Sequence, residues 1–442
     1  MYEFKTKLEP FGRGWASCES DDLEKKSACG LLQWAKDTDN LKIDSDLGLC
    51  LAYMNGVTGM TNYGPTYCGE SIQYLIDGNP DAAEPYDTWA IAADTIQKAV
   101  DYAAAGAEVV VSNGTYQLSS NVNVDKEIVL RGLTGDPKDI VLDGQRKVRC
   151  LQINAGTGAL VHSLTLHRGY VDGNWVYGGG AYVHTAGGTV SNCIVRGCHG
   201  GGKWGAGGGL YAECDNALFT HCVITNNTAS TGTNGGYISG VAVHLKGKSR
   251  LEHSFVANNH YTGGWCESTV YVENGTVRFC TIIDNQARDF GGVNLYGTTA
   301  KVEYCIIAGN TSYWSDATTY PDAERYKVWG AGNTYTQNAI ASDDATRATL
   351  AISLQITNCV ADAVLVNATC KQASLDTLLP HYADRGDAVP GALSPALNAV
   401  RPEDAGAMPS VDVFGRPRLF GSRYDLGAVE SLRGNALILL MQ

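Results

Sequence analysis

The sequence predicts an all-β protein folded as a single-stranded parallel β-helix. Two observations predict this fold class. First, a motif in which a small residue precedes branched residues recurs every 25 to 32 residues, at Cys193, Cys222, Ser254, Cys280 and Cys305. Repeats of this length are typical of solenoids. Second, each repeat holds only short β-rich runs separated by Gly and Asn turns. We therefore expect three short strands and three turns in each coil.

Equivalent residues of successive repeats should form columns, because each strand of a β-helix lies about 4.8 Å above its counterpart in the previous coil. The recurring Cys/Ser position is one inward column. Two further columns of apolar residues are expected to point inward: Val190, Phe219, Leu251, Val277 and Val302, and Val195, Ile224, Val256, Ile282 and Ile307. A polar column is expected to face solvent: Ser191, Thr220, Glu252, Arg278 and Glu303.

A column of asparagines follows five residues after the recurring position. It comprises Asn227, Asn259, Asn285 and Asn310, with Cys198 in the earliest repeat. Asparagine tolerates the left-handed backbone of a tight turn, and its amide can bond to the amides above and below. We expect these residues to form both the turn and a hydrogen-bonded ladder.

The N-terminal part of the chain has a different pattern. Residues 1–88 show no repeat and are expected to form an irregular cap or decoration. A helix is predicted from Asp94 to Gly106, with Asp94 or Thr95 as its N-cap and Gly106 as its stop. Because a β-helix must cover the open end of its core, we assign this helix a capping role. The β-helix should occupy residues 89–376, and residues 377–442 should form a C-terminal module or cap.

Composition and charge limit the classes of molecule that the protein is expected to bind. The formal net charge of −13 and the lack of a basic run argue against nucleic acid. The electrostatic field of this negative charge also disfavours a polyanionic substrate, unless a local basic patch outweighs it. No stretch reaches the roughly 18 apolar residues of a membrane span. The chain does not open with a signal peptide, so the protein is either cytosolic or a mature form whose leader was removed.

The 14 cysteines divide into members of the recurring column and others outside it. Those of the recurring column, with Cys359, are expected to be free core thiols, because residues one coil apart are too distant for an unstrained disulfide. Four lie in the N-terminal segment and could form two bridges: Cys18, Cys29, Cys50 and Cys68. Cys359 and Cys370 are an alternative pair. Bridges would place the protein outside the cytosol. A zinc site is disfavoured because the four N-terminal cysteines lack a C-x₂-C spacing.

Several motifs resemble those of known exported proteins. They are Ile96-Gln97, Val109–Val111, Gly114-Thr115-Tyr116 and Val129–Gly132 near the start, and Ser394–Ala399, Asp412–Arg418 and Asp425–Glu430 near the end. The first set resembles the opening of right-handed β-helix proteins of the pectate-lyase-like superfamily. The second is similar to the terminal module of the "choice-of-anchor Q" group. The resemblance implies a right-handed coil and an extracellular or cell-surface location, but no single activity.

Aromatic residues gather in the loops that follow the asparagine column. We predict that these loops lie side by side and form a carbohydrate-binding groove, since aromatic faces stack on sugar rings. The alternative is that the rings pack beneath the loops. The predicted sugar-binding residues are Trp175, Tyr177, Trp204, Tyr237, Trp265 and Trp314.

The same loops carry the candidate catalytic residues, which are Lys203, His260, Glu267, Arg288 and Asp289. A polysaccharide lyase needs a base and a cation that stabilises the enolate, for which Lys203 or His260 would act with Arg288. A glycoside hydrolase needs two carboxylates about 5–9 Å apart, for which Asp172, Glu267 and Asp289 are available. The motifs of polygalacturonases and the aspartate ligands of Ca²⁺-dependent pectate lyases are missing from the sequence, so no metal ligands are assigned. Ca²⁺ is the one cofactor that stays possible.

Two functions therefore remain. The first is a secreted or cell-surface polysaccharide-active protein, a lyase or a glycoside hydrolase, working along the loop face. The alternative is a non-catalytic surface adhesin or a self-assembling structural or fibre protein, since the strand edges at the ends of a solenoid allow end-to-end association. The sequence names neither the sugar nor the linkage.

Overall fold

The computed structural model confirms a parallel β-solenoid of about seven turns, and only 4% of the residues that it describes are helical. The residues that it describes are 72–75, 79–231, 236–296, 299–312, 326–328, 356–361, 371–373, 379, 389–390, 394–419 and 422–431. They fall into two compact units, divided after Val110. Residues 1–71, and with them the four N-terminal cysteines and most of the predicted decoration, lie outside the described residues.

The first unit contains the predicted helix. Its elements are β1 (Ile72–Leu75), α4 (Ile96–Tyr102) and most of β2 (Glu108–Val111). Thr95 is the N-cap, and its hydroxyl accepts a hydrogen bond from the backbone N–H of Lys98. The helix ends at Tyr102, earlier than predicted, because Ala103 leaves the helical conformation. Its apolar stripe of Ile96, Ala99 and Val100 is buried. That this helix closes the solenoid stays a prediction.

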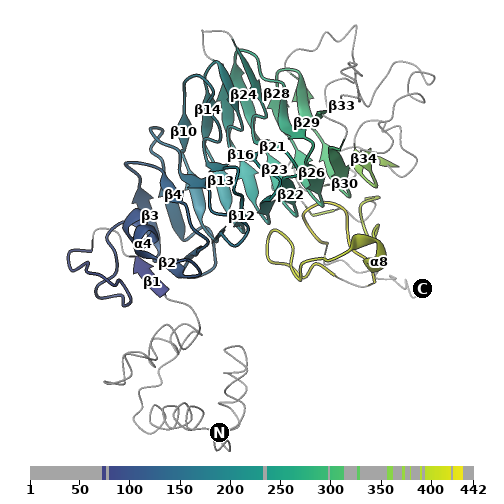
Figure 1. Cartoon of the computed structure of the whole chain (residues 1–442). Helices are drawn as coiled ribbons and strands as arrows, with labels where there is room; N and C mark the ends of the chain where they lie inside the picture. The colour runs from purple at the N-terminus through teal and green to yellow at the C-terminus, as the bar shows by residue number, and fades with distance from the viewer. Residues whose placement is uncertain are drawn as a thin grey trace, which may run out of the picture. The chain divides into compact units, whose positions relative to one another are not determined.

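The second unit winds through long parallel sheets (Figure 1). In stacking order, sheet A contains β5 (Val129–Gly132), β8 (Leu160–His162), β12 (Gly188–Ser191), β17 (Ala217–Thr220), β22 (Arg250–Glu252), β26 (Thr276–Arg278), β30 (Lys301–Glu303) and β34 (Ile356–Thr357). Sheet B contains β3 (Gly114–Gln117), β6 (Ile140–Asp143), β9 (Thr165–His167), β13 (Ile194–Arg196), β18 (Val223–Thr225), β23 (Phe255–Ala257), β27 (Thr281–Ile283), β31 (Ile306–Ala308), β35 (Val360–Ala361) and β36 (Lys371–Gln372). Sheet C contains β4 (Val122–Val124), β7 (Leu151–Ile153), β11 (Ala181–Val183), β16 (Leu210–Glu213), β21 (Val243–Lys246), β25 (Ser268–Glu273), β29 (Phe290–Tyr296) and β33 (Tyr326–Val328).

The middle coils contain more strands than the three that the sequence predicts. Sheet D comprises β10 (Tyr170–Val171), β14 (His199–Gly201), β19 (Thr228–Ser230), β24 (His260–Gly263), β28 (Gln286–Ala287) and β32 (Thr311–Ser312). Sheet E comprises β15 (Trp204–Ala206) and β20 (Tyr237–Ser239). The segments after the asparagine column are therefore strands rather than loops. Small side chains between them, such as Ala229 and Ala287, form a separate apolar cluster with Ile238 and Cys266. Because these segments contain small residues and no long run of large apolar ones, the sequence pattern does not reveal them as strands.

The predicted inward columns are confirmed. Every residue of both apolar columns is fully buried, and the Cys/Ser column is buried as well. Strand register places Val195 beside Ile224, and Ile224 beside Val256. The sulfur of Cys359 accepts a hydrogen bond from the backbone N–H of Cys305, so Cys359 belongs to the column. Its alternative partner Cys370 lies outside the described residues, and that pairing stays a prediction.

The asparagine column is a buried hydrogen-bonded ladder, but it does not form the turn. The Asn259 amide Nδ2 donates to Asn285 Oδ1 at 2.9 Å, and Asn259 Oδ1 accepts from both the backbone N–H and the amide of Asn227. The left-handed backbone lies one residue earlier, in Gly197, Asn226, Asn258, Asp284 and Gly309. The prediction is therefore right for the ladder and wrong for the turn. A residue with φ > 0 directs its own side chain away from the core, which leaves the next residue to point inward.

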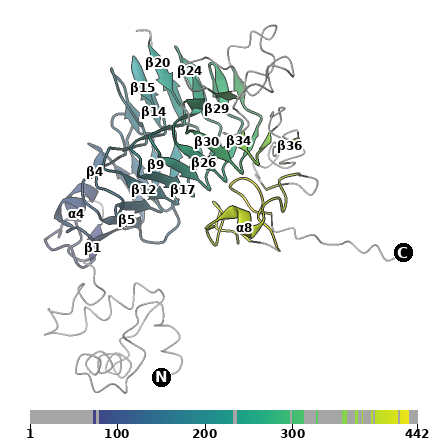
Figure 2. The same cartoon turned by 45° about the vertical axis from the view of Figure 1, so that its right-hand side comes forward.

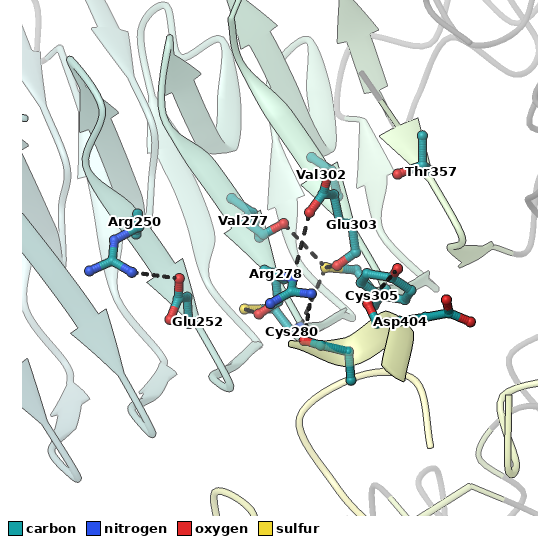
Figure 3. A network of polar contacts seen from close by, with 12 residues as sticks. Arg250, Glu252, Val277, Arg278, Cys280, Val302, Glu303, Cys305, Thr357 and Asp404 are labelled. Carbon is teal, nitrogen blue, oxygen red and sulfur yellow. Dashed lines mark hydrogen bonds and ion pairs between the residues drawn. The ribbon is translucent and has the colours of Figure 1, made fainter. Parts of the chain in front are cut away.

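The polar column two residues before the recurring position lies on the outside of the coils and is partly exposed. Its charged members form ion pairs (Figure 3). Arg278 Nε lies 3.5 Å from Glu303 on the next coil, and Arg250 bonds Glu252 at 3.1 Å within one strand. Arg278 also donates to the carbonyl of Ala405 in the C-terminal segment. This column is therefore only partly a solvent face.

Candidate functional site

Four of the predicted sugar-binding aromatics form one line across successive coils, which we call the tryptophan ladder: Trp175, Trp204, Tyr237 and Trp265. The rings of Trp175 and Trp204 stack with centroids 5.8 Å apart and an interplanar angle of 22°. Trp204 is paired with Tyr237 between β15 and β20. Trp265 precedes Cys266, which bridges to Ile238, the residue after Tyr237.

The ladder is exposed. Trp175, Trp204 and Trp265 are 65%, 41% and 43% accessible, although tryptophan is normally a largely buried residue. These rings do not merely pack beneath the neighbouring segments. Of the other two predicted members, Tyr177 packs against Tyr211 with centroids 4.4 Å apart, and Trp314 lies outside the described residues, so its place is not tested.

Three of the candidate catalytic residues come together at the Trp265 end of the ladder. The Arg288 guanidinium lies over the Trp265 ring, 3.6 Å from its centroid. The backbone N–H groups of Arg288 and Asp289 both donate to the carbonyl of Cys266, which precedes Glu267. The backbone N–H of Phe290 donates to the carbonyl of Glu267. Two carboxylates and one cation thus lie on neighbouring coils beside an exposed tryptophan.

The other two candidates are placed apart from this cluster. Lys203 is exposed and precedes Trp204 at the start of β15. His260 is exposed on β24 of sheet D, where it pairs with Thr228 and Gln286. Neither contacts Glu267 or Asp289 in any interaction found among the described residues. The structure therefore brings the backbone segments of Glu267, Arg288 and Asp289 onto neighbouring coils, and it places the two candidate bases of a lyase on other segments.

Sequence reasoning missed an outward column of sheet C that we call the tyrosine ladder: Tyr182, Tyr211, His244 and Tyr271. These residues are paired coil to coil and are at most 7% exposed. His244 lies between Tyr211 and Tyr271, with ring centroids 4.9 and 4.7 Å away. Ser239 bonds His244 Nδ1 at 2.9 Å, and the Tyr182 hydroxyl donates to Glu213. The signal was the Gly-Gly-x-x-Tyr spacing, which recurs at Tyr182 and Tyr211.

Burial sets the protonation of the tyrosine ladder. It raises the pKa of Tyr182, Tyr211 and Tyr271, with Glu213 adding to the effect at Tyr182 and Glu267 at Tyr271. Burial also lowers the pKa of His244, against the opposing effect of Glu273, whose carboxylate lies 3.7 Å from Nε2. His244 is therefore neutral near pH 7, and its contact with Glu273 is not a full ion pair.

The remaining reactive groups serve other purposes. Burial raises the pKa of Cys193 to about 12 and raises that of Cys305, so these thiols stay protonated and act as core residues. Within the described ranges, no group of three or more His, Cys, Asp or Glu side chains is arranged to hold a metal ion. In the same residues no helix is long and apolar enough to cross a membrane.

Comparison with known proteins returns no match. No family model, no curated protein and no solved structure matches this chain. The resemblance to pectate-lyase-like and choice-of-anchor proteins is thus supported only at the level of a parallel β-helix.

Proposed function

We propose that the protein is a secreted or cell-surface β-helix that binds a polysaccharide along the tryptophan ladder and hydrolyses it at the Trp265 end. The observation that carries this proposal is the alignment of three exposed tryptophans on three of four successive coils, with Tyr237 on the coil between Trp204 and Trp265. An exposed row of aromatic side chains is costly to leave in water and offers flat apolar surface to sugar rings. A polymer lying across the coils would contact several of these rings at once.

Hydrolysis is supported by the grouping of Glu267, Asp289 and Arg288. One carboxyl group would protonate the glycosidic oxygen as its bond to the anomeric carbon breaks, while the other carboxylate takes a proton from the attacking water. Arg288, held on the face of Trp265, would orient a sugar hydroxyl or carboxylate. Elimination remains the second chemistry, with Lys203 or His260 as base, but among the described residues no cation and carboxylate contact either of them.

A non-catalytic adhesin or structural protein is the second candidate, and one observation favours it. Glu267 is only 2% exposed, and a catalytic carboxyl group must reach its substrate. In that case the ladder would bind glycan and the buried charges would support the fold.

The deciding experiment is a screen of neutral and uronic-acid polysaccharides that follows reducing ends and the ultraviolet absorbance of unsaturated products. Reducing ends without unsaturated products are expected. Glu267→Gln and Asp289→Asn should each lower this rate at least about a hundredfold, because general acid and base catalysis contributes that much. Lys203→Ala and His260→Ala should leave it unchanged. Unsaturated products that vanish with Lys203→Ala or His260→Ala would establish a lyase instead, and binding without cleavage would leave the adhesin.

Binding can be tested separately from cleavage. Trp204→Ala should weaken affinity for the polysaccharide about tenfold, since loss of one aromatic anchor costs a binding site 1–2 kcal/mol, on the order of one decade in Kd. Tyr102→Ala is the matched control, because Tyr102 has the same 41% exposure and lies outside the ladder. Affinity electrophoresis in gels containing the polymer measures both variants. Equal retardation of the Trp204 variant and wild type would remove the ladder as the binding site.

A further inference from the structure

The C-terminal segment, residues 394–431, packs along the outer face of sheet B (Figures 1 and 2). Its side chains Val413 and Leu426 belong to one buried apolar cluster with Phe255, Phe279 and Ile306 of the coils. The backbone N–H of Gly427 donates to the Tyr304 carbonyl at 2.9 Å, and that of Ala428 donates to the Thr281 hydroxyl at 3.0 Å. We call this segment the C-terminal module. It covers an apolar strip that would otherwise face water.

A column of stacked rings runs beneath the module, which we call the corner stack. The rings of His221 and His253 lie 5.3 Å apart, those of His253 and Phe279 also 5.3 Å, and those of Phe279 and Tyr304 4.8 Å. All four residues have φ > 0, because they form the corner between sheets A and B. This corner conformation turns their side chains outward, toward the module.

Two arginines lie on the same aromatic stack as the two histidines, and each has a carboxylate partner: Glu430 for Arg418 and Glu303 for Arg278. Arg418 of the module is 1% exposed, and its guanidinium lies over Phe279 with a 5.3 Å centroid distance. Arg278 lies over the same ring at 5.0 Å. His221 contacts the Val411 carbonyl of the module through Nε2 at 3.2 Å. Among the described residues, Nδ1 of the buried His253 has no hydrogen-bond partner.

The acidic groups nearby are engaged elsewhere. Glu430 Oε2 lies 3.3 Å from Arg418 Nη1. Asp425 accepts hydrogen bonds from the backbone N–H groups of Asn398 and Ser431, within the module. Asp412 accepts from the backbone N–H groups of Phe414, Arg416 and Glu430, also within the module. Glu252 and Asp412 act on His221, but neither offsets a proton on His253.

We propose that this interface is an acid-sensitive latch, in which protonation of His221 and His253 beside Arg418 and Arg278 releases the C-terminal module from sheet B. Two additional positive charges would be confined among two arginines and a buried aromatic stack. Release lets the histidines reach water and separates them from Arg418. It also uncovers the apolar strip around Phe255 and Ile306.

The direction of the pH effect follows from the histidines. Burial, then Arg418, His221 and Arg278, lower the pKa of His253 to about 2, and burial also lowers that of His221. A histidine whose pKa is lower in the docked state stabilises docking fully above its ordinary value of about 6.5 and loses that contribution as the pH falls toward the docked value. At pH 5, His253 alone should weaken docking about 30-fold.

Two acidic groups titrate in the opposite direction. Burial raises the pKa of Glu430 to about 8 and raises that of Asp425. Their hydrogen-bond and ion-pair partners belong to the module itself. Any part of their pKa shift that docking adds favours the docked state at low pH, so the comparison with His253→Phe, which keeps both carboxyl groups, isolates the effect of the histidine.

The test is hydrogen exchange of the full chain, corrected for intrinsic exchange, at the backbone amides of Gly427 and Ala428. Between pH 7.5 and pH 5, protection of the wild type should fall by about 30-fold or more. His253→Phe keeps an aromatic ring in the stack but cannot be protonated, so its protection should fall much less. His167→Phe, away from the module, should behave as wild type.

Two results would overturn the proposal. One is wild-type protection that does not change between these pH values. The other is a His253→Phe variant that is well protected at pH 7.5 and loses protection at pH 5 as the wild type does. Should His253→Phe fold poorly, His253→Gln provides a second non-titrating variant, and the comparison of its two pH values decides in the same way. Polysaccharide binding is not involved in this test.

Discussion

Asn259→Ala is expected to lower the free energy of unfolding by about 4 kcal/mol. Its amide donates to the carbonyls of Ile224 and Ala257 and to Asn285 Oδ1, and its oxygen accepts from Asn227. All of these bonds are buried, so removal of the side chain leaves several donors and acceptors without partners and without water. Each orphaned group costs about 1–3 kcal/mol. Urea unfolding followed by circular dichroism measures the loss.

The matched control is Asn226→Gly, at the preceding corner. Asn226 is exposed and carries the left-handed φ of 55°, which glycine also adopts without strain. Within the part of the chain that the structure describes, its amide donates to the Thr225 hydroxyl alone. We expect a change within about 0.5 kcal/mol. If the two variants unfold at the same urea concentration, the buried ladder is not what holds adjacent coils together.

The adjacent asparagines Asn226 and Asn227 show how far the sequence predicts the fold. The period and the inward columns follow from residue types alone, since branched residues at fixed intervals have no other place to be buried. Which of two adjacent polar residues turns the chain does not follow, because Asn226 and Asn227 have the same chemistry. Only packing decides that Asn227 enters the core. The strands of sheet D escape prediction for a related reason: residues such as Ala229 and Gly200 are inward without being large.

The candidate site was predictable in part. Exposed tryptophans in successive repeats identify the ladder, because the repeat itself brings them to one side. The sequence groups Lys203 and His260 with Glu267 because all follow the asparagine column, but His260 lies on a strand of sheet D and Lys203 precedes the first strand of sheet E. The burial of Arg418 with Glu430 was not predictable either, since such pairs usually lie on the surface. In this C-terminal motif Arg418 and Glu430 are buried together and form part of the packed interior.

Gly179→Ala is expected to have the largest effect on stability, above about 4 kcal/mol and sufficient to prevent accumulation of soluble protein. A β-carbon at Gly179 would lie 2.3 Å from the His199 carbonyl oxygen and 2.5 Å from that of Gly208. Both atoms belong to the backbone of the next coil. Neither can move without breaking the hydrogen bonds that hold sheets C and D in register.

Gly205→Ala is the matched control, because the nearest atom to its added β-carbon is the Val176 carbonyl oxygen at 3.1 Å, a contact that a small shift relieves. We expect it to remain soluble and to lose no more than about 1 kcal/mol. Yield of soluble protein and thermal unfolding separate the two variants. A stable Gly179→Ala protein would mean that the coils are spaced more widely here than the structure has them. The recurring Gly-Gly pair would then serve chain flexibility. The backbone contacts at Gly179 and Gly208 indicate instead that the pair allows successive coils to approach closely. The alignment of the tryptophan ladder depends on that close approach.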